Sequence, residues 1–205
     1  MKRVAIVDYG MCNLDSVRRA VEECAGAPFV TDEPTDLGDA DVIVLPGVGA
    51  FPDAMANLRA RSLDKALDDE VLGNRVPFLG ICLGMQLLAT TGHEGGRTAG
   101  LGWIDADVRR LRPTPDDTRV PHVGWNEVVP HAEATLFAGV PERSDFYFVH
   151  SYHVECQDDT DVVATTPYCG GFVSAIQREN IFAVQFHPEK SQERGFEVLR
   201  RFLAL

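Results

Sequence analysis

The sequence predicts an α/β protein with a central, mostly parallel sheet, helices on both faces and extra β-strands in its second half. Two observations lead to this prediction. In the first half, continuous apolar runs alternate with stretches of helical period, which is typical of a parallel sheet covered on both faces. In the second half, short β-branched and aromatic runs are separated by Gly, Pro and Asp turns, which indicates short strands.

The first half is expected to supply three strands, each followed by a helix. Apolar residues recur at helical spacing after the first β-branched run, and Pro46-Gly47 ends the second run. The expected strands are Arg3–Asp8, Asp41–Leu45 and Pro77–Ile81, and the expected helices are Leu14–Cys24, Phe51–Leu72 with a break near Arg61-Ser62, and Leu83–Ala89.

The second half is expected to be mainly β-structure followed by a final helix. This helix is predicted to begin near Ser191, a favourable N-cap residue, and to bury Phe196, Leu199, Phe202 and Leu203. The expected strands are Trp103–Leu111, Trp125–Val129, Phe146–Val154, Asp161–Thr166, Val173–Gln177 and Ile181–Phe186, and the segments expected to be flexible are His93–Gly100 and Arg112–Arg119.

Length and composition favour one domain over residues 1–205, in a cytoplasmic protein. The chain has 205 residues, within the range of roughly 100–200 residues typical of one domain. It contains no apolar run near the roughly 18 residues of a membrane span, and its N-terminus does not resemble a signal peptide. The net charge of −12 argues against binding nucleic acid. A solvated acidic surface explains this charge, and adaptation to a high-salt cytoplasm is the alternative hypothesis.

The cysteines argue against a disulfide framework and a structural zinc site. Their number is odd and no C-x-x-C pair occurs, and no His pair has the i, i+4 spacing of a helical metal site. We therefore expect neither a metal nor a cofactor, and a reactive cysteine has to be distinguished by its neighbours. The five cysteines are Cys12, Cys24, Cys82, Cys156 and Cys169.

One cysteine lies in a pattern typical of nucleophiles. The sequence Gly80-Ile81-Cys82-Leu83-Gly84 follows a predicted buried strand and precedes a predicted helix, as in the G-x-nucleophile-x-G turn. The glycines allow the cramped backbone, and the helix N-terminus favours a thiolate and offers the Leu83 N–H to an oxyanion. A buried cysteine in a glycine-rich turn is the alternative interpretation.

A base for Cys82 is predicted at the end of a later apolar strand. His187 follows Ala183-Val184-Gln185-Phe186 and is followed by Pro188 and Glu189. If Pro188 keeps this segment extended, His187 and Glu189 project to the same side, so that Glu189 can orient the imidazole. A surface His–Glu pair is the alternative. Of the other histidines, His150 and His153 lie on opposite faces of a strand, His122 is a structural candidate, and His93 and His131 are expected in loops.

The motifs resemble those of the class I (triad) glutamine amidotransferases, which have a flavodoxin-like fold. Gly80 to Gln86 and His187-Pro188-Glu189 carry the resemblance, and Pro46-Gly47-Val48-Gly49 is similar to the oxyanion strand of that family. Within the family, further segments resemble the glutaminase subunits of imidazole glycerol phosphate synthases, with Cys12 as a departure where those subunits usually have Gly. These segments are Asp8-Tyr9-Gly10, Asn13 to Val17, Pro46 to Phe51, Pro121 to Asn126 and Phe148 to Tyr152.

The resemblance implies a reaction and a set of site residues. Cys82 would attack the side-chain amide of glutamine after His187 takes its proton, ammonia would leave, and water would hydrolyse the glutamyl thioester to glutamate. The oxyanion would be bound by Leu83 and by the Val48–Gly49 segment. The substrate-binding residues that the resemblance implies are Gly47, Gln86, Glu94, Ser151 and Tyr152.

The resemblance also implies a partner, a (β/α)8-barrel cyclase subunit that forms a heterodimer with this chain. The cyclase would use the ammonia to make imidazole glycerol phosphate and aminoimidazole carboxamide ribotide in histidine biosynthesis, and the segments around Asp8–Ser16 and Pro121–Asn126 are candidates for the interface. The alternatives are a subunit serving another synthase, as in the anthranilate or pyridoxal phosphate pathway, a cysteine hydrolase that acts without a partner, and a non-catalytic binding subunit.

Overall fold

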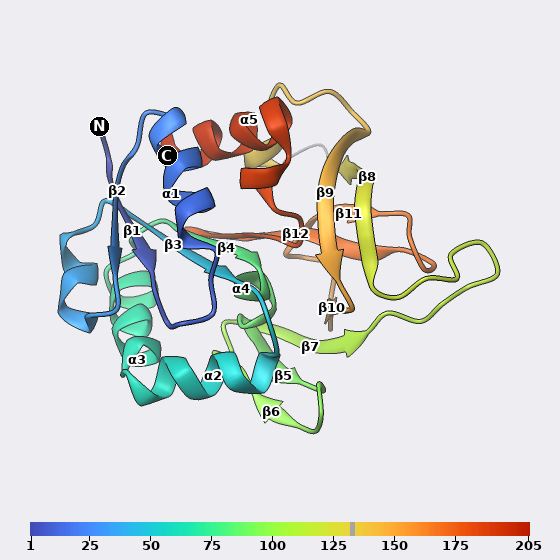
Figure 1. Ribbon diagram of the computed structural model, residues 1–205, viewed down its shortest axis with the longest axis horizontal. Coiled ribbons are helices and arrows are strands. Elements are labelled where there is room, and N and C mark those ends of the chain that lie inside the picture. Colours follow the sequence, from blue (N-terminus) through green and yellow to red (C-terminus); the bar gives the residue numbers. More distant parts are fainter. Residues whose placement is uncertain (132–133) are drawn as a thin grey trace.

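The protein is built around a large mixed sheet, seen in a computed structural model that describes residues 1–131 and 134–205 (Figure 1). Nine strands within these residues follow the order β2-β1-β3-β4-β13-β12-β11-β8-β9. The five strands from β2 to β13 are parallel, and the other four pair antiparallel. The nine strands of this sheet are β1 (Arg3–Val7), β2 (Ala27–Thr31), β3 (Val42–Gly47), β4 (Phe78–Cys82), β8 (His122–Pro130), β9 (Ser144–His150), β11 (Val162–Thr166), β12 (Phe172–Arg178) and β13 (Ile181–Val184).

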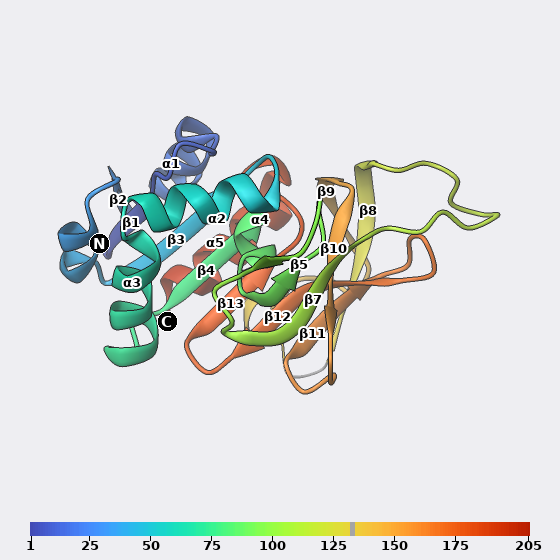
Figure 2. The same cartoon turned by 90° about the horizontal axis from the view of Figure 1, so that it is seen from below.

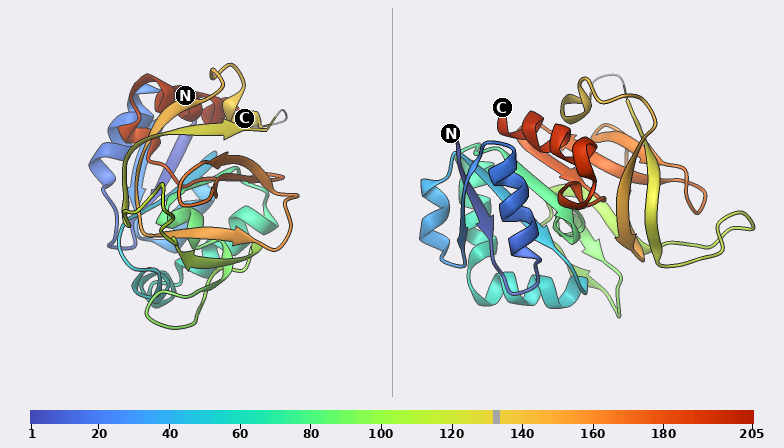
Figure 3. Two further views of the ribbon diagram at one scale, coloured as in Figure 1. Left: turned by 90° about the vertical axis from the view of Figure 1, so that its right-hand side faces the viewer. Right: turned by 45° about the horizontal axis from the view of Figure 1, so that its top comes forward.

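Helices cover both faces of the parallel half of the sheet. Helices α1 (Leu14–Glu23) and α5 (Gln192–Leu203) lie side by side on one face, with both termini of the chain at that end (Figures 1 and 3). The opposite face is covered by α2 (Phe51–Ala60), α3 (Leu63–Leu67) and the π-helical turn η2 (Asp68–Gly73). The predicted α/β arrangement is therefore confirmed.

A smaller sheet extends this second layer. It has the order β10-β7-β5-β6 and lies beside α2, below the antiparallel half of the main sheet in Figure 1 and in front of it in Figure 2. A long connection between β7 and β8 projects away from both sheets. The strands are β5 (Ala89–Gly92), β6 (Thr98–Ala99), β7 (Ile104–Arg110) and β10 (Tyr152–Cys156), and the remaining short helical turns are η1 (Pro34–Asp39), α4 (Leu83–Gln86), η3 (Thr135–Phe137) and η4 (Pro188–Lys190).

The apolar strand runs fill two separate cores, one on each face of the sheet. In β1, Val4 and Ile6 pack with α1 and α5, whereas Ala5 and Val7 pack with α2 and α3. All four of these side chains are fully buried. A strand buried on both faces needs apolar residues at every position rather than at alternate ones, which explains the continuous runs in the sequence.

Several expected boundaries are wrong. The helix predicted over Leu83–Ala89 ends at Gln86, because Ala89–Gly92 forms β5 and pairs with β7. The strand predicted over Phe146–Val154 is two strands, which break at Ser151 and enter different sheets. The predicted break at Arg61-Ser62 is present, with Ser62 in the left-handed region at φ 57°.

Two further elements were not anticipated. Strand β2 escaped prediction, since Ala27–Thr31 contains a proline and lies at the edge of the sheet. Part of the segment expected to be flexible, His93–Gly100, forms β6. Within residues 1–131 and 134–205, no helix combines the length and apolarity needed to cross a membrane.

Close backbone contact between β3 and the turn after β4 positions the carboxyl end of the sheet. A Cβ atom added to Gly84 would lie 1.9 Å from the carbonyl oxygen of Leu45 in β3. The neighbouring turn has the same requirement, because a Cβ on Gly80 would lie 2.8 Å from the Gly84 oxygen. Only glycine at these positions allows α4 to rest directly on the strands.

We expect Gly84→Ala to destabilise the protein by about 3 kcal/mol or more, since the new methyl group meets backbone that cannot rotate away. Gly73→Ala is the matched control, because its Cβ would meet only the Asp68 oxygen at 4.0 Å. Urea unfolding of both variants measures the difference. Equal stability of the two variants would contradict this account of the β3–α4 contact.

Candidate active site

Three neighbouring parallel strands end at one edge of the sheet and bring the sequence-predicted residues together. Gly47, the last residue of β3, is paired with Cys82, the last residue of β4. The next strand, β13, ends at Val184, beside Ile81, and leads directly to Gln185 and His187. Ligands of open α/β sheets bind at the carboxyl ends of such strands.

Cys82 occupies the tight strand-to-helix turn expected of a nucleophile. Its φ of 55° and ψ of −107° place it in a region that residues other than glycine rarely adopt. Such strain costs on the order of 1–3 kcal/mol and persists only where the surroundings enforce it. Helix α4 is a single turn, so the long helix dipole expected behind Cys82 is absent and local N–H groups take its place.

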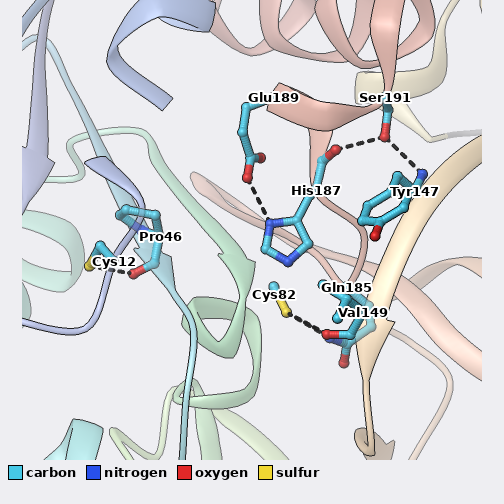
Figure 4. A network of polar contacts seen from close by, with 9 residues as sticks. All are labelled: Cys12, Pro46, Cys82, Tyr147, Val149, Gln185, His187, Glu189 and Ser191. Atoms are coloured by element: carbon cyan, nitrogen blue, oxygen red, sulfur yellow. Dashed lines mark hydrogen bonds and ion pairs between the residues drawn. The ribbon is translucent and has the colours of Figure 1, made fainter. Parts of the chain in front are cut away.

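His187 and Glu189 form a buried pair. His187 Nδ1 lies 2.7 Å from Glu189 Oε1, and the two side chains are 3% and 2% exposed. Nε2 of His187 faces Cys82 (Figure 4) and has no hydrogen-bond partner among the described residues. The expected extended conformation is wrong, since Pro188–Lys190 forms a 3-10 turn. Pro188 occupies the first position of this turn, where its missing N–H costs nothing.

The main chain of His187 is fixed by β9 and Ser191. Its N–H donates to the Tyr147 oxygen at 2.9 Å, and its own carbonyl accepts from Ser191 Oγ at 2.6 Å. Ser191 Oγ also accepts from the Tyr147 N–H at 3.0 Å (Figure 4). Ser191 therefore occupies the predicted N-cap position of α5, but its hydroxyl makes no bond to the helix and instead joins the helix start to the sheet.

Opposing effects act on the pKa of His187. Burial lowers this pKa, whereas the adjacent Cys82 and the carboxylate of Glu189 raise it, and the raising effects are larger. A raised pKa makes the His187 imidazole a stronger acceptor for the proton of a neighbouring thiol. The arrangement is therefore suited to nucleophilic attack by sulfur, with His187 as the proton carrier.

The comparisons with known proteins agree with this geometry. The family model described as glutamine amidotransferase class-I matches residues 5–204. The chain belongs to this family. The resemblance inferred from the motifs is thereby confirmed.

Two curated relatives indicate which kind of amidotransferase subunit this chain resembles. The chain is 49% identical to imidazole glycerol phosphate synthase subunit HisH of Moorella thermoacetica, over 98% of this chain and 94% of the relative. It is 44% identical to subunit HisH 1 of Campylobacter jejuni strain RM1221, over 98% of this chain and 100% of the relative.

Solved structures support the fold. The crystal structure of a putative GMP synthase subunit from Thermoplasma acidophilum has a TM-score of 0.76 at 23% identity, covering 100% of this chain and 93% of that one. The structure of PurLQS from Thermotoga maritima has a TM-score of 0.75 at 20% identity, covering 100% and 99%. At these identities the likeness concerns the fold alone.

A cavity of about 280 Å³ opens next to Cys82. Most of the residues predicted from sequence line this cavity, but His187, Glu189 and Gly47 do not. His187 lies on the other side of Cys82 with Glu189 next to it (Figure 4), and Gly47 is the last residue of β3. A Cβ on Gly47 would lie 2.1 Å from Tyr9 Oη and 2.9 Å from the Leu83 side chain, so this glycine provides space. The predicted residues that line the cavity are Val48, Gly49, Cys82, Leu83, Gln86, Glu94, Ser151 and Tyr152.

Two polar side chains that line the cavity already make hydrogen bonds within the protein. Gln86 Nε2 donates to the Tyr152 carbonyl at 2.8 Å and to Gln185 Oε1 at 3.0 Å. Glu94 Oε2 accepts from the Phe51 N–H at the start of α2, at 2.8 Å. The side-chain amide oxygen of Gln86 (Oε1) and the second carboxylate oxygen of Glu94 (Oε1) are therefore the acceptors that these side chains retain for a ligand.

The predicted oxyanion donors differ in their availability. The Val48 N–H donates to the Met11 carbonyl at 2.9 Å, so it does not point at the position where an oxyanion would form. Gly49, at φ +114°, has a conformation that only glycine adopts readily. Leu83 is the first residue of α4, where the N–H has no partner within the helix.

Gln185 is a polar residue of the site that sequence analysis did not identify. It is fully buried, and its Nε2 lies 3.6 Å from Cys82 Sγ (Figure 4). The signal available in the sequence was an amide inside an apolar strand end, two residues before His187. A buried amide requires hydrogen-bond partners, and here they are the neighbouring site residues.

Two further histidines form a neutral buried chain that ends at the cavity wall. His122 Nδ1 lies 3.1 Å from His150 Nε2, and His150 Nδ1 lies 2.8 Å from the Tyr152 carbonyl. Burial lowers the pKa of His122 to about 4 and that of His150 to about 3. His122 thus has the structural role expected of it, and it also contacts Asn126 at 3.2 Å.

The other thiols lack the surroundings of a nucleophile. Burial raises the pKa values of Cys12, Cys24 and Cys156 to about 11, which keeps these thiols protonated near pH 7. The part of the chain that the structure describes contains no group of three His, Cys, Asp or Glu side chains arranged to hold a metal ion.

The neutral histidine chain predicts a loss of stability in acid. Folding lowers the pKa values of His122 and His150 below the usual 6.5. The contribution of the two imidazoles to the free energy of unfolding is therefore complete above pH 6.5 and is lost as the pH falls toward 4. Each imidazole adds a slope of about 1.4 kcal/mol per pH unit over that interval. Between pH 7 and 4.5, the free energy of unfolding measured in urea should fall less steeply with pH in the double variant His122→Gln, His150→Gln than in the wild type.

His131→Gln, which removes an exposed imidazole, is the control and should keep the wild-type slope. The raised pKa of His187 acts above pH 6.5, where its contribution is lost as pH rises, so it does not mask this effect. An unchanged slope in the double variant would contradict the neutral state of the pair.

Proposed function

We propose that this chain hydrolyses glutamine to glutamate and ammonia as the glutaminase subunit of an imidazole glycerol phosphate synthase. The observation that carries the proposal is the buried series Cys82, His187 and Glu189 beside the cavity. His187 faces Cys82 with one ring nitrogen and holds Glu189 at 2.7 Å with the other. The names of the relatives, at 44% and 49% identity over nearly the whole chain, support the pathway.

The proposed reaction uses His187 twice. The thiol proton of Cys82 passes to His187, the sulfur attacks the amide carbon, and His187 then gives the proton to the departing nitrogen, which leaves as ammonia. In the second half, His187 takes a proton from water as the water oxygen attacks the thioester carbon. The C–S bond then breaks, the Cys82 sulfur recovers that proton from His187, and glutamate is released. Glu189 keeps the imidazole in the orientation that both steps need.

The oxyanion requires a change at Val48. Its N–H donates to Met11, so this peptide has to rotate before it can join the Leu83 N–H in binding the developing charge. Gly49 gives the segment the backbone freedom for this rotation. We infer that the oxyanion strand is not preset, and that the turn containing Met11 controls it.

The substrate would be held by the acceptors that the cavity retains. Gln86 and Glu94 are positioned for the α-ammonium group of glutamine. The carbonyls of Ser151 and Tyr152 accept hydrogen bonds from Leu111 N–H and from Gln86 Nε2. The Tyr152 carbonyl also contacts His150 Nδ1 at 2.8 Å, so both of its lone pairs are engaged, whereas the Ser151 carbonyl keeps one acceptor position for substrate.

The partner would be a (β/α)8-barrel cyclase that docks around the mouth of the cavity. Four apolar side chains are exposed there on neighbouring segments, an unusual density for a surface with no partner. The segment Asp8–Ser16 lies next to the same opening, because the Met11 carbonyl accepts the hydrogen bond from the Val48 N–H. The four side chains are Val48 (39% exposed), Val123 (57%), Trp125 (47%) and Val149 (36%).

Cys82→Ala is expected to reduce glutamate release in the complex by at least ~10³-fold, since no other group can form the thioester. Cys156→Ala is the control, because Cys156 lies in β10 with its pKa raised to about 11. Glutamate is measured by a coupled dehydrogenase assay. Turnover by Cys82→Ala near the wild-type rate would refute the mechanism.

The cyclase and its substrate should stimulate glutamine hydrolysis, because Val48 has to be released from Met11 for full activity. Trp125→Asp should weaken binding of the cyclase by about tenfold or more, as expected for a central aromatic contact. Val30→Asp is the matched control, since Val30 is 40% exposed on the edge strand β2. High activity of the isolated chain, unchanged by the cyclase, would favour a partner-free hydrolase instead.

A further inference from the structure

The amide of Gln185 occupies the space between the nucleophile and the substrate-binding side chain Gln86. Its backbone is fixed by the bond from its N–H to the Ser174 carbonyl at 2.9 Å. Its side chain is fully buried and has two partners, Gln86 on one side and Cys82 on the other. The catalytic steps described above do not use this residue.

The direction of this amide is set by a backbone carbonyl. The carbonyl of Tyr152 can only accept, so the amide nitrogen of Gln86 has to face it, at 2.8 Å. The same nitrogen donates to Gln185 Oε1 at 3.0 Å. With its oxygen held there, Gln185 can only present its NH2 group to Cys82 Sγ, at 3.6 Å.

The two hydrogen-bonding neighbours of the sulfur favour different protonation states. The Val149 carbonyl, 4.0 Å from Sγ, can accept only from the thiol. The Gln185 amide can donate to the sulfur in either state, and a charged acceptor strengthens such a bond. When the proton leaves for His187, the contact with Val149 loses its attraction while the contact with Gln185 gains strength.

We propose that Gln185 is a positioning residue that holds the Cys82 sulfur and stabilises its thiolate, and that Gln86 fixes the direction of the Gln185 amide. This proposal rests on the proposed function, since it assigns a role within the same site. Because the donor is neutral, it stays in place at every pH at which the enzyme works. The titratable groups around the sulfur are His187 with Glu189 behind it, Tyr9 beside Gly47, and His150 and Glu94 in the cavity wall.

The test compares Gln185→Leu, which removes the donor, with Gln185→Glu, which keeps the shape but replaces the donor by an acceptor. The rate of alkylation of Cys82 by iodoacetamide is followed from pH 5 to 9 by mass spectrometry of the labelled peptide. We expect the pH midpoint of alkylation to rise by about one unit in Gln185→Leu, since a bond to a charged group contributes roughly 1.5 kcal/mol. A larger rise is expected in Gln185→Glu.

Turnover in the complex with the cyclase supplies a second measurement. We expect kcat to fall about tenfold in Gln185→Leu, with a smaller change in KM for glutamine, because the lost bond acts on the thiolate. Gln177→Leu is the matched control, since the Gln177 side chain, on β12, bonds the Thr135 N–H away from the site. It should keep the wild-type alkylation profile.

A folded Gln185→Leu or Gln185→Glu variant with the wild-type alkylation profile and kcat would overturn the proposal. If Gln185→Leu does not fold, the near-isosteric Gln185→Glu decides, and if neither folds, Gln185→Met replaces them. Failure of the proposed function is recognised separately. In that case Cys82→Ala keeps its turnover, while the alkylation profile of the Gln185 variants still reports on the sulfur.

Discussion

The positive φ of Cys82 is the constraint on which the rest of the site depends. At φ 55° the residue turns the chain from β4 into α4 within a single step, and the strain has to be enforced by the surroundings. The enforcement comes from backbone packed on backbone, with Gly84 against Leu45 of β3 and Gly80 against Gly84 itself. The sulfur is thereby directed to the end of β13, where His187 and Gln185 leave the sheet.

Around this turn, hydrogen bonds connect the cysteine to the strands at the far edge of the sheet. Gln185 and Gln86 lead from Cys82 to the Tyr152 carbonyl, and that same carbonyl accepts from His150. His150 continues to His122. Because the amide and imidazole side chains of this series are buried and neutral, it holds its geometry without the desolvation cost that buried charges would bring. The buried ion pair beside the sulfur is that of His187 and Glu189.

The sequence was informative where local chemistry decides the structure. The apolar runs located most strands, and the glycines on either side of Cys82 predicted the tight turn that the structure contains. The errors occur where long-range pairing decides: Ala89–Gly92 is a strand only because β7 lies beside it, and Ser151 divides two strands only because two sheets compete for them. Gln185 was overlooked for a related reason, since a lone amide in an apolar segment gives no indication of its partners.

The division at Ser151 gives the cavity wall an unusual attachment. Strand β9 closes the large sheet at one edge, and after one residue the chain enters the small sheet as β10. Ser151, which lines the cavity, is the single residue between the two strands, and its carbonyl accepts from the Leu111 N–H at 2.9 Å, just beyond β7. The cavity wall therefore passes from one hydrogen-bonded sheet to the other within a single residue, with Val149 and His150 in the large sheet and Tyr152 in the small one.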